Sequence, residues 1–151
     1  MYLGPSTTAC LAFPGAHAKP ARVVKSVIRA EATLGPIPIL ELSTERTSSW
    51  SCVISVSGEL DRASVPALRE VVAAEVANDR IRQLVLDLED VEFVDAGGLR
   101  LLLDASEAMR KDGRRFCVVC TNPHVLRMFT LTDVRLNVVR SRESALGGAA
   151  A

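Results

Sequence analysis

Residues 84–99 read LVLDLEDVEFVDAGGL, and the fold class follows from their pattern. Residues 84–88 are apolar except for Asp87, which is typical of a strand that is covered on both faces. Asp95 and two glycines follow, and from Leu99 the apolar residues recur at helical spacing. Gly113 predicts the end of that helix. A buried strand that runs directly into an amphipathic helix is the repeating unit of a largely parallel α/β sheet.

The same alternation of strand and helix continues on both sides of this unit. We predict further strands at 37–42, 52–57, 116–120 and 136–139, and further helices at 64–78, 122–130 and 143–146. Ser64 and Asn122 are the expected N-caps of two of these helices. Pro38 cannot donate to a ladder, so the first of these strands is expected at an edge, antiparallel to the next. The prediction is a single α/β domain over residues 35–146, with a mixed, mostly parallel β-sheet, an antiparallel edge pair and interspersed helices.

The composition excludes several classes of function. The 18 basic and 18 acidic residues balance to a net charge of zero, which argues against nucleic acid as a partner, because that binding requires a basic face. No run of 18 consecutive apolar residues is present, so no integral membrane span is expected. A cytoplasmic protein is predicted.

The two ends of the chain differ in character from its centre. Residues 1–34 are predicted to be a disordered basic leader, and residues 147–151 a disordered tail. Val23, Val24, Val27 and Ile28 fall at helical spacing, so a short amphipathic helix that touches a membrane or a partner is an alternative for 21–32. A start codon placed too far upstream is another, and the sequence does not choose between them. The leader and the Pro38 edge strand are both compatible with self-association.

No catalytic set is recognisable in the sequence. His17 and His124 belong to no catalytic motif, and the turn at residues 95–98 lacks the lysine and the spaced glycines of a phosphate-binding loop. The acidic residues between 87 and 92 are interpreted as the solvated face of a loop rather than as a metal site. We therefore expect neither an enzyme nor a bound cofactor or metal.

Cys117 and Cys120 form a CxxC pattern, but their position on a predicted strand argues against a redox or zinc motif. On a strand, Cys117 and Cys120 lie roughly 10 Å apart and face opposite sides, whereas a disulfide requires Cα atoms within about 7 Å. Buried thiols that pack as small apolar side chains are expected. A pair between Cys52 and one of these two remains an alternative.

Three stretches of the sequence resemble the STAS domain of bacterial anti-sigma factor antagonists. The first stretch, VSGELD at 56–61, resembles the end of a strand in the family. The second, LVLDLEDVEFVDAGGL at 84–99, resembles the family's central strand and the Asp-Ser-Ser/Thr-Gly-Leu turn that follows it. The third, CTNPHVLRMF at 120–129, resembles the next strand and helix. The resemblance covers most of the chain between Ile37 and Leu146. It implies a protein-binding module that docks on a kinase-type anti-sigma factor and thereby frees a sigma factor for transcription.

The resemblance also implies a switch that this chain departs from. In the family, the kinase phosphorylates a serine of the turn. A phosphate at the start of a helix adds close to two negative charges to the surface that binds the partner. Here the turn reads Asp95-Ala96-Gly97-Gly98-Leu99, so Ala96 stands at the position of the serine and neither Ala96 nor Gly97 carries a hydroxyl. The expected N-cap is Asp95, and Gly97 and Gly98 are expected to permit a tight turn.

Two functional hypotheses follow from this departure. In the first, the chain is an anti-sigma factor antagonist that is not switched by phosphorylation at the usual turn. Its predicted partner-binding residues are Asp61, Arg62, Asp95, Ala96, Gly97, Gly98, Leu99, Arg100 and Asp104. In the second, it is a STAS module outside sigma circuits, either a structural subunit of a signalling assembly or an accessory subunit of a membrane transporter.

Overall fold

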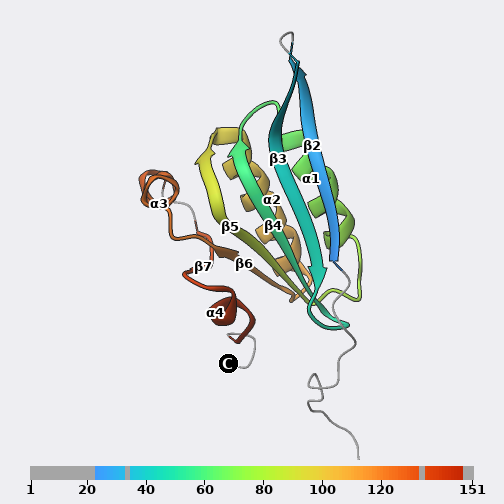
Figure 1. Cartoon of the computed structure of the whole chain (residues 1–151). Helices are drawn as coiled ribbons and strands as arrows, with labels where there is room; N and C mark the ends of the chain where they lie inside the picture. Colours follow the sequence, from blue (N-terminus) through green and yellow to red (C-terminus); the bar gives the residue numbers. More distant parts are fainter. Residues whose placement is uncertain (1–22, 33–34, 133–134, 148–151) are drawn as a thin grey trace, which may run out of the picture.

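The computed structural model describes residues 23–32, 35–132 and 135–147 of the 151-residue chain. Strands and helices alternate along most of this length (Figure 1). The elements are β2 (Val23–Ala32), β3 (Gly35–Arg46), β4 (Ser51–Leu60), α1 (Val65–Val76), β5 (Gln83–Val94), α2 (Ala96–Lys111), β6 (Arg115–Val119), α3 (Pro123–Leu131), β7 (Val138–Val139) and α4 (Arg142–Gly147). The predicted α/β class and every predicted strand and helix between residues 37 and 146 are confirmed.

The strands form one mixed sheet of six strands in the order β2-β3-β4-β5-β6-β7. β4, β5, β6 and β7 pair in parallel, while β2, β3 and β4 pair antiparallel. The predicted antiparallel pair of β3 and β4 is therefore confirmed. Parallel neighbours align their carboxyl ends, so the ends of β4 and β5 and the loops that follow them meet at one side of the sheet.

The predictions for residues 21–34 require correction. Residues 23–32 form the outer strand β2 and not a helix or a disordered leader, and Gly147, predicted to begin a disordered tail, ends α4. The rest of the predicted leader (1–22 and 33–34) and of the predicted tail (148–151) lies outside the described part of the chain. β-branched residues at four of these positions favour a strand once a neighbour offers an unpaired backbone.

β3 is consequently an inner strand, which contradicts the expected edge position of Pro38. The register between β2 and β3 shifts at this place, where Ile28 pairs with Leu40 but Arg29 pairs with Pro38. Such a bulge interrupts the ladder beside a residue that has no N–H to contribute.

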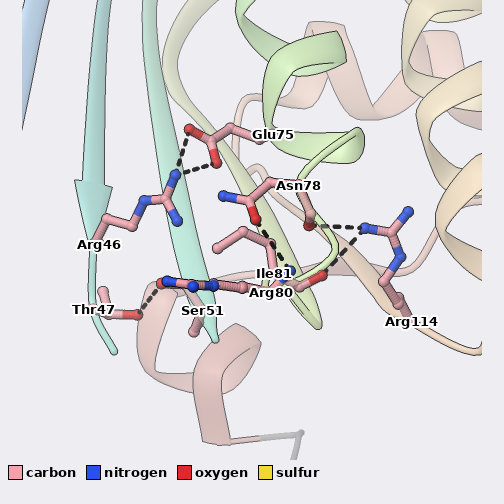
Figure 2. A network of polar contacts seen from close by, with 8 residues as sticks. All are labelled: Arg46, Thr47, Ser51, Glu75, Asn78, Arg80, Ile81 and Arg114. Carbon is pink, nitrogen blue, oxygen red and sulfur yellow. Dashed lines mark hydrogen bonds and ion pairs between the residues drawn. The ribbon is translucent and has the colours of Figure 1, made fainter. Parts of the chain in front are cut away.

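The main core lies between the sheet and the helices α1 and α2, which cover one of its faces (Figure 1), and Val125 and Phe129 of α3 also belong to it. Cys52, Ile54 and Val56 of β4 share this face, as their alternation predicted. At one end of the layer, Arg46 of β3 donates to both carboxylate oxygens of Glu75 on α1, at 3.1 and 2.8 Å (Figure 2). This pair ties the end of a strand to the end of the helix that covers it.

A smaller apolar cluster occupies the other face of the sheet, where Val53, Val85, Cys117 and Val119 pack against Ala145 of α4. Both faces of β5 are therefore covered near its start, as predicted. Cys117 and Cys120 belong to opposite faces, which confirms that they do not form a bridge. Cys52 is on β4, whereas Cys117 is on β6 and Cys120 directly follows β6, so β5 lies between Cys52 and both of them; all three thiols are free, and neither alternative pairing is formed.

The interpretation of residues 87–92 as a loop is wrong, because they lie within β5. Asp87 is buried, and its carboxylate accepts a hydrogen bond from Nε of Arg142 at 2.5 Å. The same guanidinium contacts Glu45 of β3 and Ser55 of β4. An acidic side chain is tolerated at this buried position because α4 brings a cation onto it.

Candidate functional site

The turn between β5 and α2 is closed by Asp95, as the sequence predicted. Its backbone is extended, with φ −91° and ψ −176°, and its Oδ1 accepts a hydrogen bond from the Gly98 N–H at 2.8 Å. The Asp95 carbonyl accepts the first helical hydrogen bond, from the Leu99 N–H at 2.9 Å. Asp95 is thus an N-cap whose negative charge also lies at the positive end of a helix of 16 residues.

Gly98 is required at this turn by close packing and not by an unusual backbone angle. A Cβ atom there would lie 3.1 Å from both Leu60 Cβ and Val94 Cγ1, and 3.3 Å from the Leu60 carbonyl oxygen. Among the described glycines, only Gly58 and Gly113 have a positive φ. The expected role of Gly97 and Gly98 in permitting a tight turn is therefore corrected: Gly98 lets the start of α2 approach the end of β4.

Asp61 organises the neighbouring loop between β4 and α1. Its Oδ1 accepts hydrogen bonds from the N–H groups of Ala63 and Ser64, at 2.9 and 3.1 Å. The Ser64 hydroxyl donates to the Glu59 carbonyl at 2.6 Å and makes no capping bond to α1. Ser64 occupies the predicted N-cap position, but its side chain holds the loop together instead of the helix.

The predicted partner-binding residues lie at the carboxyl ends of two adjacent strands. The Asp95 N–H donates to the Leu60 carbonyl at 2.9 Å, and this bond joins the two loops. Arg62, Ala96, Gly97, Arg100 and Asp104 are exposed, and Asp61 and Asp95 are partly exposed. We call these seven residues, whose part in docking is a prediction, the docking face. Gly98 and Leu99 are buried, so they support the face without contributing side-chain surface to it.

Salt bridges extend the docking face along the helices. Arg100 Nε lies 3.1 Å from Asp104 Oδ1, one turn further along α2. Arg69 of α1 lies 3.7 Å from the other carboxylate oxygen of Asp104, so this residue joins both helices. These side chains are about half exposed or more, and such pairs contribute little to stability. Their charges remain accessible to solvent.

Phe93 is a residue that the sequence analysis missed. It lies two positions before Asp95, pairs in register with Glu59 of β4, and is 47% exposed. The register between β4 and β5 shifts just before it, and Glu92 and Phe93 are both exposed as a result. Strict alternation would have turned one of the two inward. An exposed aromatic side chain beside a docking face is a typical interface anchor.

The described residues hold no group of three or more side chains placed to bind a metal ion. His124 is exposed in the first turn of α3. Burial raises the pKa of Cys52 to about 12, and it also raises the pKa values of Cys117 and Cys120. These thiols are therefore poor nucleophiles in the folded chain. Across the described ranges, no helix is both long and apolar enough to cross a membrane.

Comparisons with known proteins identify relatives over the same region. The family described as "STAS domain" matches residues 41–145. An anti-sigma-B factor antagonist of Staphylococcus aureus is 28% identical over 82 residues, which is 54% of this chain and 75% of that protein. An anti-sigma F factor antagonist of Paenibacillus polymyxa is 25% identical over 82 residues, 54% of this chain and 70% of that one.

The fold is also shared with a solved structure. The crystal structure of an anti-sigma factor antagonist from Mycobacterium paratuberculosis superposes with a TM-score of 0.63 and 26% identity, covering 93% of this chain and all of that one. The family match begins within β3 and ends within α4, and it includes the docking face. The chain therefore belongs to the STAS domain family.

Proposed function

We propose that this chain is an anti-sigma factor antagonist that binds an anti-sigma factor through the docking face and thereby frees a sigma factor. The observation that carries the proposal is that the two loops of the docking face are joined. The Asp95 N–H donates a hydrogen bond to the Leu60 carbonyl, and this bond holds the two loops together. A preformed face lowers the entropy lost on binding. The names of the relatives from S. aureus and M. paratuberculosis support the same function.

The charge around the docking face favours a basic partner surface. Glu59 and Glu92 are exposed beside Asp61 and Asp95, while Arg62 and Arg100 are the basic residues of the face. Asp104 already pairs with Arg100. A partly acidic rim of this kind accelerates association with a basic patch more than it adds affinity. The exposed ring of Phe93 supplies the apolar contact that such a rim lacks.

The proposed partner is an anti-sigma factor of the serine kinase type, and the proposed place of action is the cytoplasm. Ala96 and Gly97 are the exposed residues of the turn and neither has a hydroxyl group to phosphorylate. The antagonist would then stay in its binding-competent state whatever the ATP supply. Control by the amount of protein, or by a modification elsewhere, would replace the phosphate switch.

A binding titration of the full chain against the anti-sigma kinases of the host, in ADP and in ATP, tests this proposal. We expect tight binding that prolonged incubation with ATP does not reverse. Glu59→Lys reverses an exposed acidic charge beside the docking face and should weaken binding to a basic partner surface at least about tenfold, whereas the equally exposed Glu143→Lys on α4 should not. No binding to any such kinase would refute the proposed function.

The variant Ala96→Ser separates the partner from the switch. If the kinase binds this variant and phosphorylates the new serine, the turn has kept the geometry of a substrate and lost only its hydroxyl. If it binds but leaves the serine unmodified, the proposal of a kinase-type partner acting at this turn is wrong while the docking proposal stands.

A further inference from the structure

We propose that a pocket at the far end of α2 binds a small organic anion that carries phosphate or carboxylate groups. The pocket has a volume of about 400 Å³ and lies between the last turns of α2, the start of β6 and the segment before β7. This volume is within the usual range for small-molecule sites, which is about 300–1,000 Å³. Four arginines line it: Arg110, Arg114, Arg115 and Arg135.

The positive charge of the pocket is only partly compensated. Arg114 pairs with Asp112 at 2.8 Å, and Arg110 approaches Glu107 at 3.9 Å through a contact that is mostly exposed. Arg115 and Arg135 make no ion pair with any residue in the described ranges. Guanidinium groups bind phosphate and carboxylate through pairs of parallel hydrogen bonds, so this set of residues selects an oxyanion.

Arg114 supplies a fixed positive charge at the wall of the pocket. It is 7% exposed, and its Nη1 donates to the carbonyls of Ile81 and Asn78, at 3.2 and 3.4 Å (Figure 2). Its Nε–H is buried and has no hydrogen-bond partner among the described residues. A buried cation with an unpaired donor is costly, and a negative charge held nearby by the other arginines would offset that cost.

The remaining lining is partly apolar, which sets the kind of anion. Phe116 is buried and Leu136 half-buried, and both line the pocket between the arginines. A ligand with an anionic group and a carbon skeleton uses both features, whereas an inorganic ion uses only the first. The pocket is distant from the turn that begins α2, because Ala96 and Arg110 lie 14 residues apart on this helix, which is about 21 Å, although Asp104 of the docking face lies only six residues before Arg110. The two sites can be tested separately.

Calorimetric titration of the full chain with pyrophosphate and with citrate, each at an ionic strength matched by NaCl, tests the proposal. We expect saturable binding of at least one probe in the micromolar to millimolar range. Pyrophosphate alone indicates a phosphate ligand and citrate alone a carboxylate ligand. If neither probe binds saturably at millimolar concentration, the pocket is not an anion site.

Matched variants place the binding in the pocket. Arg115→Gln and Arg135→Gln each remove one exposed guanidinium that lines it, and Arg127→Gln removes an exposed guanidinium of α3 that does not. The first two should weaken binding at least about tenfold, with unchanged circular dichroism, and the third should leave it within about twofold. Equal losses in all three variants would mean that the probes respond to net charge, and the proposal would be wrong.

Discussion

The backbone N–H of Asp95 donates to the carbonyl oxygen of Leu60 at 2.9 Å, and this bond joins the last residue of β4 to the residue that caps α2. A one-residue shift of register between the two strands precedes it. The bond fixes where α2 begins relative to β4, and Gly98 then packs directly onto Leu60.

Loss of the Asp95 side chain should destabilise the fold through α2. Asp95→Ala removes the acceptor of the Gly98 N–H bond, so we expect the free energy of unfolding in urea to fall by about 1 kcal/mol. Asp95→Asn keeps an oxygen acceptor and should lose less than half of that. Equal stabilities of the wild type and Asp95→Ala would show that the cap contributes nothing.

A methyl group at Gly98 should be far more harmful than one at the end of α4. Gly98→Ala places a Cβ 3.1 Å from Leu60 and Val94, and because both neighbours belong to the core, about 1–3 kcal/mol of stability should be lost. Gly147→Ala meets nothing within 4 Å and serves as the matched control. Thermal unfolding of the two variants measures the difference, and similar melting temperatures would contradict the close-packing role.

Phe93 should contribute to partner binding and little to stability. It is 47% exposed, so Phe93→Ser should leave the melting temperature nearly unchanged and weaken binding to the anti-sigma factor at least about tenfold. Trp50 is 44% exposed in the turn before β4, at the opposite end of the sheet, and Trp50→Ser is the control. Equal affinities of the two variants would remove Phe93 from the interface.

The Cys52 thiol should be protected from alkylation in the folded chain. Its pKa rises from 9.0 to about 12, chiefly by burial, so at pH 8 the thiolate population falls about a thousandfold. Burial adds a barrier of access, and iodoacetamide should label Cys52 at least about a hundredfold more slowly in the native chain than in the urea-unfolded chain. Peptide mass spectrometry measures both rates, and comparable rates would mean that β4 opens readily.

The same shift gives a direction for the pH dependence of stability. The native state favours the neutral thiol, so its contribution is full below about pH 9 and is lost as the pH rises from 9 toward 12. Cys52→Ala should therefore show a smaller decline of unfolding free energy over that window than the wild type. Identical slopes in the two proteins would contradict the assignment.

Local patterns predicted the elements well because the helices carry one apolar stripe and the inner strands are almost wholly apolar. The caps at Asp95 and Asn122 were equally readable, since each precedes a helix with a side chain suited to the role, and both accept the expected hydrogen bond. The features that the sequence did not predict depend on how strands pair across the sheet. The strand at 23–32 has helical spacing and becomes β2 only because β3 offers it a partner.

The sequence predicted where the candidate site lies in the fold, but not which of its side chains are exposed. Gly98 and Leu99 belong to the family turn, yet both are buried by the approach of α2 to Leu60. Phe93 reads as one more apolar residue of a buried strand, and only the register shift against β4 exposes it. Register shifts leave no periodic trace in a single strand, so no local pattern could have found this residue.

The ion pair of Asp87 with Arg142 should behave as a coupled unit. Arg142→Gln leaves a buried carboxylate without its cation, so we expect a loss of about 2–4 kcal/mol in the free energy of unfolding. Asp87→Asn leaves a guanidinium that is 42% exposed and should be the milder change, because water can solvate it. The double variant removes the unpaired buried charge and should recover most of the loss seen in Arg142→Gln. Urea unfolding of all four proteins gives the coupling energy, and strictly additive effects would show that α4 is held to the sheet by its apolar contacts alone.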